Sequence, residues 1–213
     1  NGWMRRPDAD KGRAFSYDDQ YGSAIQTWEF NQAFAGHRFD IIAWDCSLMQ
    51  MLEVAYELRP FAGLVAGSEE SPPGEGYPYD AIFRRFRDNP GLPTRDLSKS
   101  FVDGMVNDPR YTGRKITQSV VDTTKLPALA QGVDKLGRAL FAAKDVMADD
   151  IREVRQTAQA YSPTRSRTYR DLIDVCRLLA ASPSAPTSVR TAAGEASALA
   201  QQPWTQYRLF LRP

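Results

Sequence analysis

The sequence predicts an α/β fold in which a mostly parallel sheet is flanked by helices. Two short, largely apolar runs at residues 39–44 and 63–67, and a third run at residues 115–122 that is half β-branched, have the composition and length of strands. Segments whose apolar residues recur every three or four positions lie between and after these runs, as in amphipathic helices. Strands that alternate with helices are typical of a parallel sheet covered on both faces.

The first half of the chain contains the strands of this predicted sheet. Residues 1–24 are polar and glycine-rich, so we expect a long exposed loop there, followed by a short helix at about 26–35. Apolar residues recur at helical spacing from Leu48, which predicts a helix that begins directly after Ser47 and ends before Pro60. Two further helices are expected at residues 79–88 and 94–107.

The second half of the chain is predicted to be mainly helical. Between residues 126 and 154 the apolar positions keep a spacing of three or four, which indicates a long amphipathic helix broken at most once. Two further helices and a final strand are expected at residues 167–181, 187–201 and 206–213. We therefore divide the chain into an α/β core, residues 1–124, and a mainly helical extension packed on it, residues 125–213.

The composition argues against several classes of function. The 27 basic and 26 acidic residues nearly cancel, so no overall field attracts nucleic acid. No apolar run approaches the roughly 20 residues of a membrane helix, and we expect a soluble protein, in the cytoplasm rather than secreted. Cys46 and Cys176 lie in apolar surroundings and indicate reduced thiols, while His37 is the single histidine, which excludes the common zinc sites. We expect no metal site.

A candidate catalytic position lies where the first predicted strand gives way to a helix, at Asp45, Cys46 and Ser47. Ligands of α/β sheets bind beyond the carboxyl ends of the strands, and a helix N-terminus favours an anion there. Side chains alternate along a strand, so Asp45 and Ser47 are expected on one side and Cys46 on the other, as a packing residue. The structural alternative is a small buried cysteine followed by a helix-capping serine.

The single histidine cannot serve as the general base for this position. Ten residues separate His37 from Ser47, and across a strand, at about 3.3 Å per residue, they lie roughly 30 Å apart. A base must come within about 3 Å of the proton that it removes. We therefore expect His37 on the surface at the strand entrance, and no usable base in this chain.

Three further motifs follow the candidate position: residues 53–58 read "EVAYEL", residues 68–70 read "SEE" and residues 73–79 read "PGEGYPY". With the apolar run and the candidate position before them, they make residues 39–79 resemble the clostripain family of caspase-like cysteine peptidases. The family pattern is an apolar strand, then Asp-Ala-Cys-Leu-Met, then a helix and a Pro-Gly loop. Weaker similarity extends over the chain as far as about residue 180. The resemblance implies a caspase-like fold whose first strands are missing from this chain, and a cysteine endopeptidase.

The resemblance also implies a register for the three candidate residues. It aligns Asp45 with the family's Asp and Ser47 with its catalytic Cys. A serine hydroxyl is a much weaker nucleophile than a thiolate when only a histidine assists it, so the chain as written is expected to be almost inactive. Three explanations remain open: a deliberate Cys-to-Ser change, a natural pseudopeptidase that binds basic peptides, or a nucleophile shifted to Cys46.

Other parts of the site are implied by the resemblance alone. The catalytic His should lie upstream of Asn1, on a preceding segment or a separate chain. Family members often cleave themselves after a basic residue in the loop before the Cys, and the candidates are Arg13 and Lys11. Self-cleavage, calcium or a regulatory protein partner could order the loops. No other cofactor is expected.

Specificity for a basic side chain is implied by Asp45. In the family this Asp lies in the pocket for the residue before the cleaved bond (P1), where a carboxylate pairs with Arg or Lys. Arg is favoured through its planar fork. Glu69 and Glu70 could add to an acidic wall, and Ser68 could line it. The expected substrate is a protein or peptide with Arg or Lys at P1.

Overall fold

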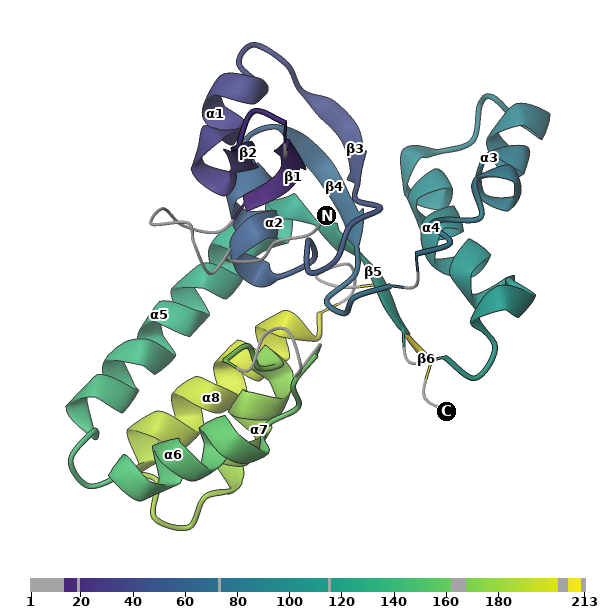
Figure 1. Ribbon diagram of the computed structural model, residues 1–213. Helices are drawn as coiled ribbons and strands as arrows, with labels where there is room; N and C mark the ends of the chain where they lie inside the picture. Colours follow the sequence, from purple (N-terminus) through teal and green to yellow (C-terminus); the bar gives the residue numbers. More distant parts are fainter. Residues whose placement is uncertain are drawn as a thin grey trace. The chain divides into compact units, whose positions relative to one another are not determined.

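The computed structural model describes residues 14–18, 20–72, 74–114, 116–161, 168–202 and 207–211 (Figure 1). The chain divides into two compact units. The first unit consists of Asn1–Thr124 together with Gln206–Pro213, and the second of Lys125–Thr205.

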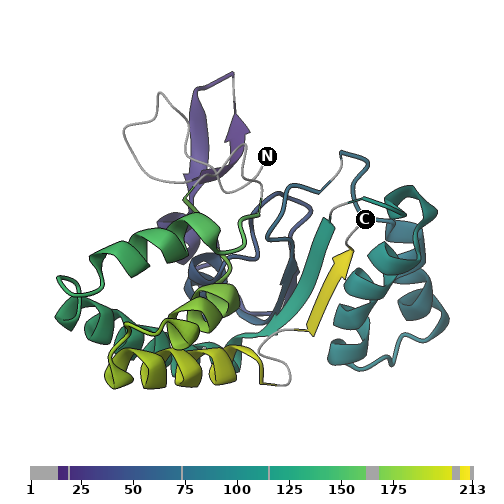
Figure 2. The ribbon, with the colours of Figure 1, turned by 90° about the horizontal axis from the view of Figure 1, so that it is seen from below.

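The first unit contains a four-stranded sheet with the order β3-β4-β5-β6. Its strands are β3 (Phe39–Ala43), β4 (Ala62–Gly67), β5 (Ile116–Asp122) and β6 (Tyr207–Leu211). Figure 2 shows β6, from the end of the chain, beside β5. The α/β class and all four expected strands are thereby confirmed. Every residue of β5 is buried, which fits a strand in the middle of the sheet.

The strand directions differ in part from the prediction of a mostly parallel sheet. β3 and β4 are parallel, but β4 pairs antiparallel with β5, and β5 with β6. Two helices, α3 (Tyr79–Asp88) and α4 (Thr94–Asn107), connect β4 to β5. Ile82 near the start of α3 lies against Gly104 near the end of α4, so the helices run antiparallel. An antiparallel helix pair brings the chain back to the end of the sheet at which β4 finishes, and β5 therefore runs antiparallel along β4.

A short antiparallel hairpin occupies part of the N-terminal segment, where we expected only a loop. Its strands are β1 (Ala14–Asp18) and β2 (Ser23–Gln26). The Asp18 carboxylate accepts hydrogen bonds from the N–H groups of Gln20 and Tyr21, at 3.0 and 3.2 Å, and closes the turn. The described residues of the hairpin are mostly exposed, so no apolar alternation marked it in the sequence.

The helix after Ser47 begins later than predicted. Helix α2 spans Leu52–Leu58, and the residues before it form an irregular turn. The N–H groups of Leu48 and Gln50 donate to carbonyl groups just beyond β4, at 3.3 and 3.2 Å, instead of starting a helix. Ser47 is therefore not at a helix N-terminus, although apolar residues recur at helical spacing from Leu48.

The remaining helices of the first unit are short, apart from α3 and α4, whose predicted bounds are confirmed. The segment before β3 forms a 3-10 turn and a single helical turn, as expected. The short helical elements are η1 (Thr27–Glu29), α1 (Phe30–Ala33), η2 (Pro109–Tyr111) and η3 (Thr123–Lys125). The core of this unit includes the fully buried Val65, Ile82, Met105 and Val120.

The second unit is a group of helices with its own apolar core. The predicted long helix is broken once, into α5 (Leu126–Ala142) and α6 (Ala148–Thr157). The other two helices are α7 (Leu172–Ala181) and α8 (Thr187–Ala200). Met147, Cys176, Val189 and Ala193 are among the buried residues that they share.

Candidate active site

The predicted nucleophile position lies in the turn that follows β3. Asp45 is exposed, whereas Cys46 and Ser47 are partly buried. The next residue, Leu48, is 1% exposed and has a φ of +64°. A bulky residue with a left-handed backbone is rare, and such strain persists only where the surroundings enforce it, often at active sites. The strained residue directly follows Ser47.

Hydrogen bonds from β4 and the residues after it hold this turn. Leu48 N–H donates to the carbonyl of Glu70 at 3.3 Å, and Gln50 N–H donates to that of Ser68 at 3.2 Å. The Gln50 side chain, only 2% exposed, donates from Nε2 to the carbonyl of Val65 at 3.0 Å. The position of Ser47 is therefore determined by the neighbouring strand.

The "SEE" residues support the turn, which differs in part from their expected role as a pocket wall. Ser68 is buried, and its hydroxyl lies 3.0 Å from Thr117 Oγ1 and accepts the Glu70 N–H at 3.0 Å. Glu69 N–H donates to the same threonine oxygen at 3.0 Å. Ser68 is therefore not an open wall residue. The sequence could not show this, because its partner lies 49 residues further along the chain.

The Asp45 carboxylate is held by the loop that precedes α3. Its Oδ2 atom accepts hydrogen bonds from Tyr77 N–H at 3.2 Å and from the Tyr79 hydroxyl at 2.9 Å. Gly76 has a φ of +69°, and a Cβ atom added to it would lie 2.9 Å from the same oxygen. Only glycine lets the backbone pass so close to the carboxylate in this conformation. Asp45 is thus fixed by residues more than thirty positions away.

Buried side chains anchor this loop in turn. The Tyr77 hydroxyl donates to the carbonyl of Trp44 at 2.7 Å and accepts from Gln118 Nε2 at 2.8 Å. Burial raises the pKa of Tyr77 well above its usual value, so the hydroxyl stays protonated. The Tyr111 hydroxyl donates to the carbonyl of Gly76. The loop therefore has fixed contacts on both sides of its bond to Asp45.

Tyr79 joins the Asp45 carboxylate to an aromatic face of α3. Its ring stacks on that of Phe83, with centroids 6.2 Å apart. Partial burial and the hydrogen bond to Asp45 raise the pKa of Tyr79 to about 12. The hydroxyl consequently remains a donor to the carboxylate at neutral pH. About half of this side chain is exposed, so a ligand at Asp45 could also reach the ring.

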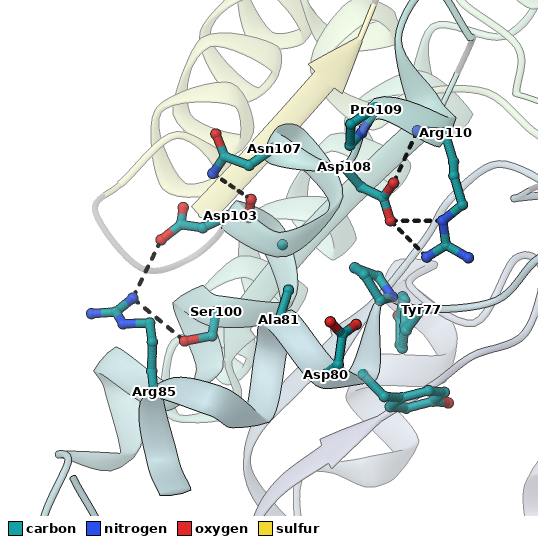
Figure 3. A pocket seen from close by; sticks show the side chains of 13 residues that line it. Tyr77, Asp80, Ala81, Arg85, Ser100, Asp103, Asn107, Asp108, Pro109 and Arg110 are labelled. Atoms are coloured by element: carbon teal, nitrogen blue, oxygen red, sulfur yellow. Dashed lines mark hydrogen bonds and ion pairs between the residues drawn. The ribbon is translucent and has the colours of Figure 1, made fainter. Parts of the chain in front are cut away.

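A groove of about 650 Å³ adjoins the same loop, between α3, α4 and η2. Tyr77 is one of the residues that line the groove, and Figure 3 shows the charged side chains around it. Arg85 pairs with Asp103 at 3.7 Å, and Arg110 pairs with Asp108 at 2.6 Å. Because both arginines already have carboxylate partners, we assign no ligand to this groove.

Neither thiol has the surroundings of an activated nucleophile. Burial raises the pKa of Cys46, and the charge of Asp45 raises it further, so the thiolate is disfavoured. Burial raises the pKa of Cys176, in the second unit, to about 11. His37 is exposed and lies before β3, whereas Ser47 lies after that strand. This position of His37 fits the prediction that it lies on the surface at the strand entrance.

Several predictions fall outside the described residues, or concern groups that are not found among them. Arg13 and Lys11, the candidate self-cleavage sites, lie outside the described residues. Within the described ranges, no three His, Cys, Asp or Glu side chains are placed to hold a metal ion. No helix in that part of the chain combines the length and apolar character needed to cross a bilayer.

Our sequence interpretation missed the residues that position Asp45. Gly76, Tyr77 and Tyr79 stand in the stretch "PGEGYPY", which we used only as a mark of resemblance. A glycine between polar and aromatic residues indicates a special backbone position but does not show what the loop contacts. Only the packing of the loop against the end of β3 reveals its role.

Comparisons with known proteins identify the family and the fold. A family model described as the clostripain family, peptidase C11, matches residues 1–199. A secreted C11 cysteine protease from Bacteroides thetaiotaomicron, solved with an irreversible peptide inhibitor, superposes with a TM-score of 0.66 at 20% identity over 99% of this chain and 55% of that one. An inactive zymogen C11 protease from Parabacteroides distasonis superposes with a TM-score of 0.57 at 16% identity, over 99% of this chain and 53% of that one.

A cysteine protease from B. fragilis gives a TM-score of 0.55 at 16% identity, over 92% of this chain and 78% of that one. The chain thus spans about half the length of the first two structures. At these identities the superpositions establish the fold. The search of curated proteins found no significant match.

Proposed function

The chain belongs to the clostripain family of cysteine peptidases, and from this we propose that it is the nucleophile-substituted form of a cysteine endopeptidase that cleaves after Arg or Lys. The observation that supports the specificity is the exposed Asp45 carboxylate, held by two hydrogen bonds, two residues before Ser47. An exposed, fixed carboxylate beside the nucleophile position suits a substrate with a basic P1 side chain.

In this proposal Ser47 occupies the nucleophile position and leaves the chain almost inactive. The strained turn at Leu48 aims the position, and the backbone N–H of Ser47 is a candidate oxyanion donor. The general base is a histidine supplied by a segment upstream of Asn1. The raised pKa of Cys46 argues against a nucleophile shifted to that residue, because the reactive form of a cysteine is the thiolate.

Further parts of the proposal concern the wall of the pocket, processing and location. Glu69 and Glu70 would increase the negative potential around the P1 site. Self-cleavage after Arg13 or Lys11 would occur only in an enzyme with a reactive thiol. We propose no cofactor, and assays in EDTA and in calcium decide whether calcium is needed. One structural relative is described as secreted, so the comparisons give no support to the cytoplasmic location favoured by the sequence.

The decisive experiment restores the thiol. Ser47→Cys, in a protein that carries the proposed upstream histidine segment, should cleave peptides after Arg and Lys, and the parent should not. Asp45→Asn in the same background keeps the size of the side chain but removes its charge. We expect it to lower kcat/KM for basic peptides by about 100-fold, from the loss of a charge-assisted bond. Absence of any cleavage by the Ser47→Cys protein would contradict the peptidase proposal.

The second candidate function is a natural pseudopeptidase that binds basic peptides without cleaving them. The serine at the nucleophile position favours it, and it uses the same Asp45 carboxylate. A binding measurement on the parent chain tests the feature that both candidates share: an Arg peptide should bind more tightly than its norleucine analogue. The Ser47→Cys experiment then separates the two, since a pseudopeptidase remains inactive after the substitution.

A further inference from the structure

The two oxygens of Asp45 have different surroundings. Both hydrogen bonds that the carboxylate accepts, from Tyr77 N–H and from the Tyr79 hydroxyl, end on Oδ2. Gly76 lies nearer to the same oxygen: a Cβ atom added to Gly76 would be 2.9 Å from Oδ2 and 3.8 Å from Oδ1. Among the described residues no hydrogen bond to Oδ1 is found, and Asp45 is exposed. In the part of the chain that the structure describes, Oδ1 is therefore the carboxylate oxygen left as an open acceptor.

The two donors that bind Oδ2 are held in place by contacts of their own. Tyr77 is buried, and its hydroxyl bonds to the Trp44 carbonyl at 2.7 Å. Tyr79 stacks on Phe83 and remains protonated, so its hydroxyl donates rather than accepts. A half-turn of the Asp45 carboxylate only exchanges two equivalent oxygens, so in either orientation one oxygen accepts both bonds and the other makes neither.

A carboxylate oxygen has two lone pairs, and Oδ2 already accepts two hydrogen bonds. The planar fork of a guanidinium makes its two parallel bonds to a carboxylate through one lone pair on each oxygen. An ammonium group needs one acceptor only, because it acts as a compact point charge. With Oδ2 saturated, a guanidinium and an ammonium are left with the same single acceptor.

We propose that Tyr79 is a specificity-determining residue that confines the basic side chain of the substrate to Oδ1 of Asp45. This inference deepens the proposed function and rests on it. The bound side chain makes one charge-assisted hydrogen bond whether it is Arg or Lys. The fork geometry that the sequence led us to expect for Arg is unavailable, so the site accepts Lys as readily as Arg.

The chain with Ser47 allows a direct test, because binding can be measured without cleavage. Three peptides that differ only in one residue, Arg, Lys or norleucine, are titrated into the parent chain and into Tyr79→Phe. We expect the parent to bind the Arg and Lys peptides within about threefold of each other. Tyr79→Phe keeps the ring but frees one lone pair on Oδ2, and should raise the Arg-to-Lys affinity ratio by threefold or more.

A matched control removes a tyrosine hydroxyl that makes no hydrogen bond to Asp45: Tyr56→Phe, on α2, should leave the Arg-to-Lys ratio of the parent unchanged. A parent that prefers Arg more than tenfold, or a Tyr79→Phe variant whose ratio stays within twofold of the parent, overturns the inference while the basic preference stands. Equal binding of the norleucine peptide is a different result, because it removes the basic pocket and with it the proposed function.

Discussion

Replacing Gly76 by Ala should disable recognition of a basic side chain at Asp45 and leave the fold in place. Gly76 has a φ of +69°, a conformation that costs a residue with a Cβ roughly 1–2 kcal/mol. The new Cβ would also lie 2.9 Å from Asp45 Oδ2, closer than Cβ contacts in real structures. Either the loop or the carboxylate must move, and the two hydrogen bonds on that oxygen are strained or lost.

The magnitude follows from these two effects. Hydrogen bonds to a charged acceptor contribute about 1.5–3 kcal/mol each, less where they are half-exposed as at Asp45. Together with the backbone strain, we expect the free energy of unfolding to fall by about 2–4 kcal/mol. Affinity for an Arg peptide should fall by about tenfold or more, equivalent to roughly 1.4 kcal/mol. Urea unfolding and peptide titration measure the two quantities separately.

Two other glycines provide matched controls. Gly36 and Gly113 have φ values of +75° and +72°, and a Cβ added to either has no atom within 4 Å. Gly36→Ala and Gly113→Ala should therefore lose stability through backbone strain alone, about 1–2 kcal/mol, and should bind the Arg peptide like the parent. If Gly76→Ala loses no more stability than these controls and keeps its Arg affinity, the loop does not hold Asp45 as described.

Three further predictions concern other parts of the chain. Cys46→Ala in the reactivated Ser47→Cys enzyme should change kcat/KM by less than threefold, and a loss above 100-fold would assign the nucleophile to Cys46 instead. In the second unit, Gly137→Ala should raise the free energy of unfolding by about 0.5–1 kcal/mol. Gly132→Ala should give no such gain in urea unfolding, because its Cβ would lie 2.8 Å from Leu199. Finally, the pKa of Tyr79 is raised to about 12 in the folded chain, whereas the tyrosine of the unfolded chain loses its proton near pH 10. The stability that this difference contributes is therefore fully present below pH 10 and is lost as the pH rises toward 12. Tyr79→Phe should therefore show a smaller loss of unfolding free energy between pH 9 and pH 11 than the parent, and an equal loss would contradict the raised pKa.

Local patterns were sufficient for most of the secondary structure. Residues 79–88 and 94–107 show helical periodicity of their apolar positions, and both helices have the predicted bounds. The run at residues 115–122 was recognised as a strand, and half of its residues are β-branched; the described strand, Ile116–Asp122, is buried throughout. These signals depend on backbone geometry over a few residues, so they can be interpreted without knowing what packs against them.

Features set by longer-range contacts were predicted less well. The direction of β5 (Ile116–Asp122) depends on how α3 and α4 pack against each other, which alternation of strands and helices does not reveal. The turn at Leu48 shows apolar residues at helical spacing, yet its N–H groups find better-placed carbonyl acceptors beyond β4. A local preference for helix was overridden by hydrogen bonds to a neighbouring segment.

The sequence by itself determined the family, the elements of the sheet and the positions of Asp45 and Ser47 at the end of a strand. Tertiary structure alone decided that Tyr77 and Tyr79 hold one oxygen of that Asp and leave the other open. The physical reason is that a hydrogen bond selects its acceptor by position in space. The donors lie 32 and 34 residues from Asp45 in the sequence. The local sequence pattern of either segment cannot predict that the two segments come within hydrogen-bond distance.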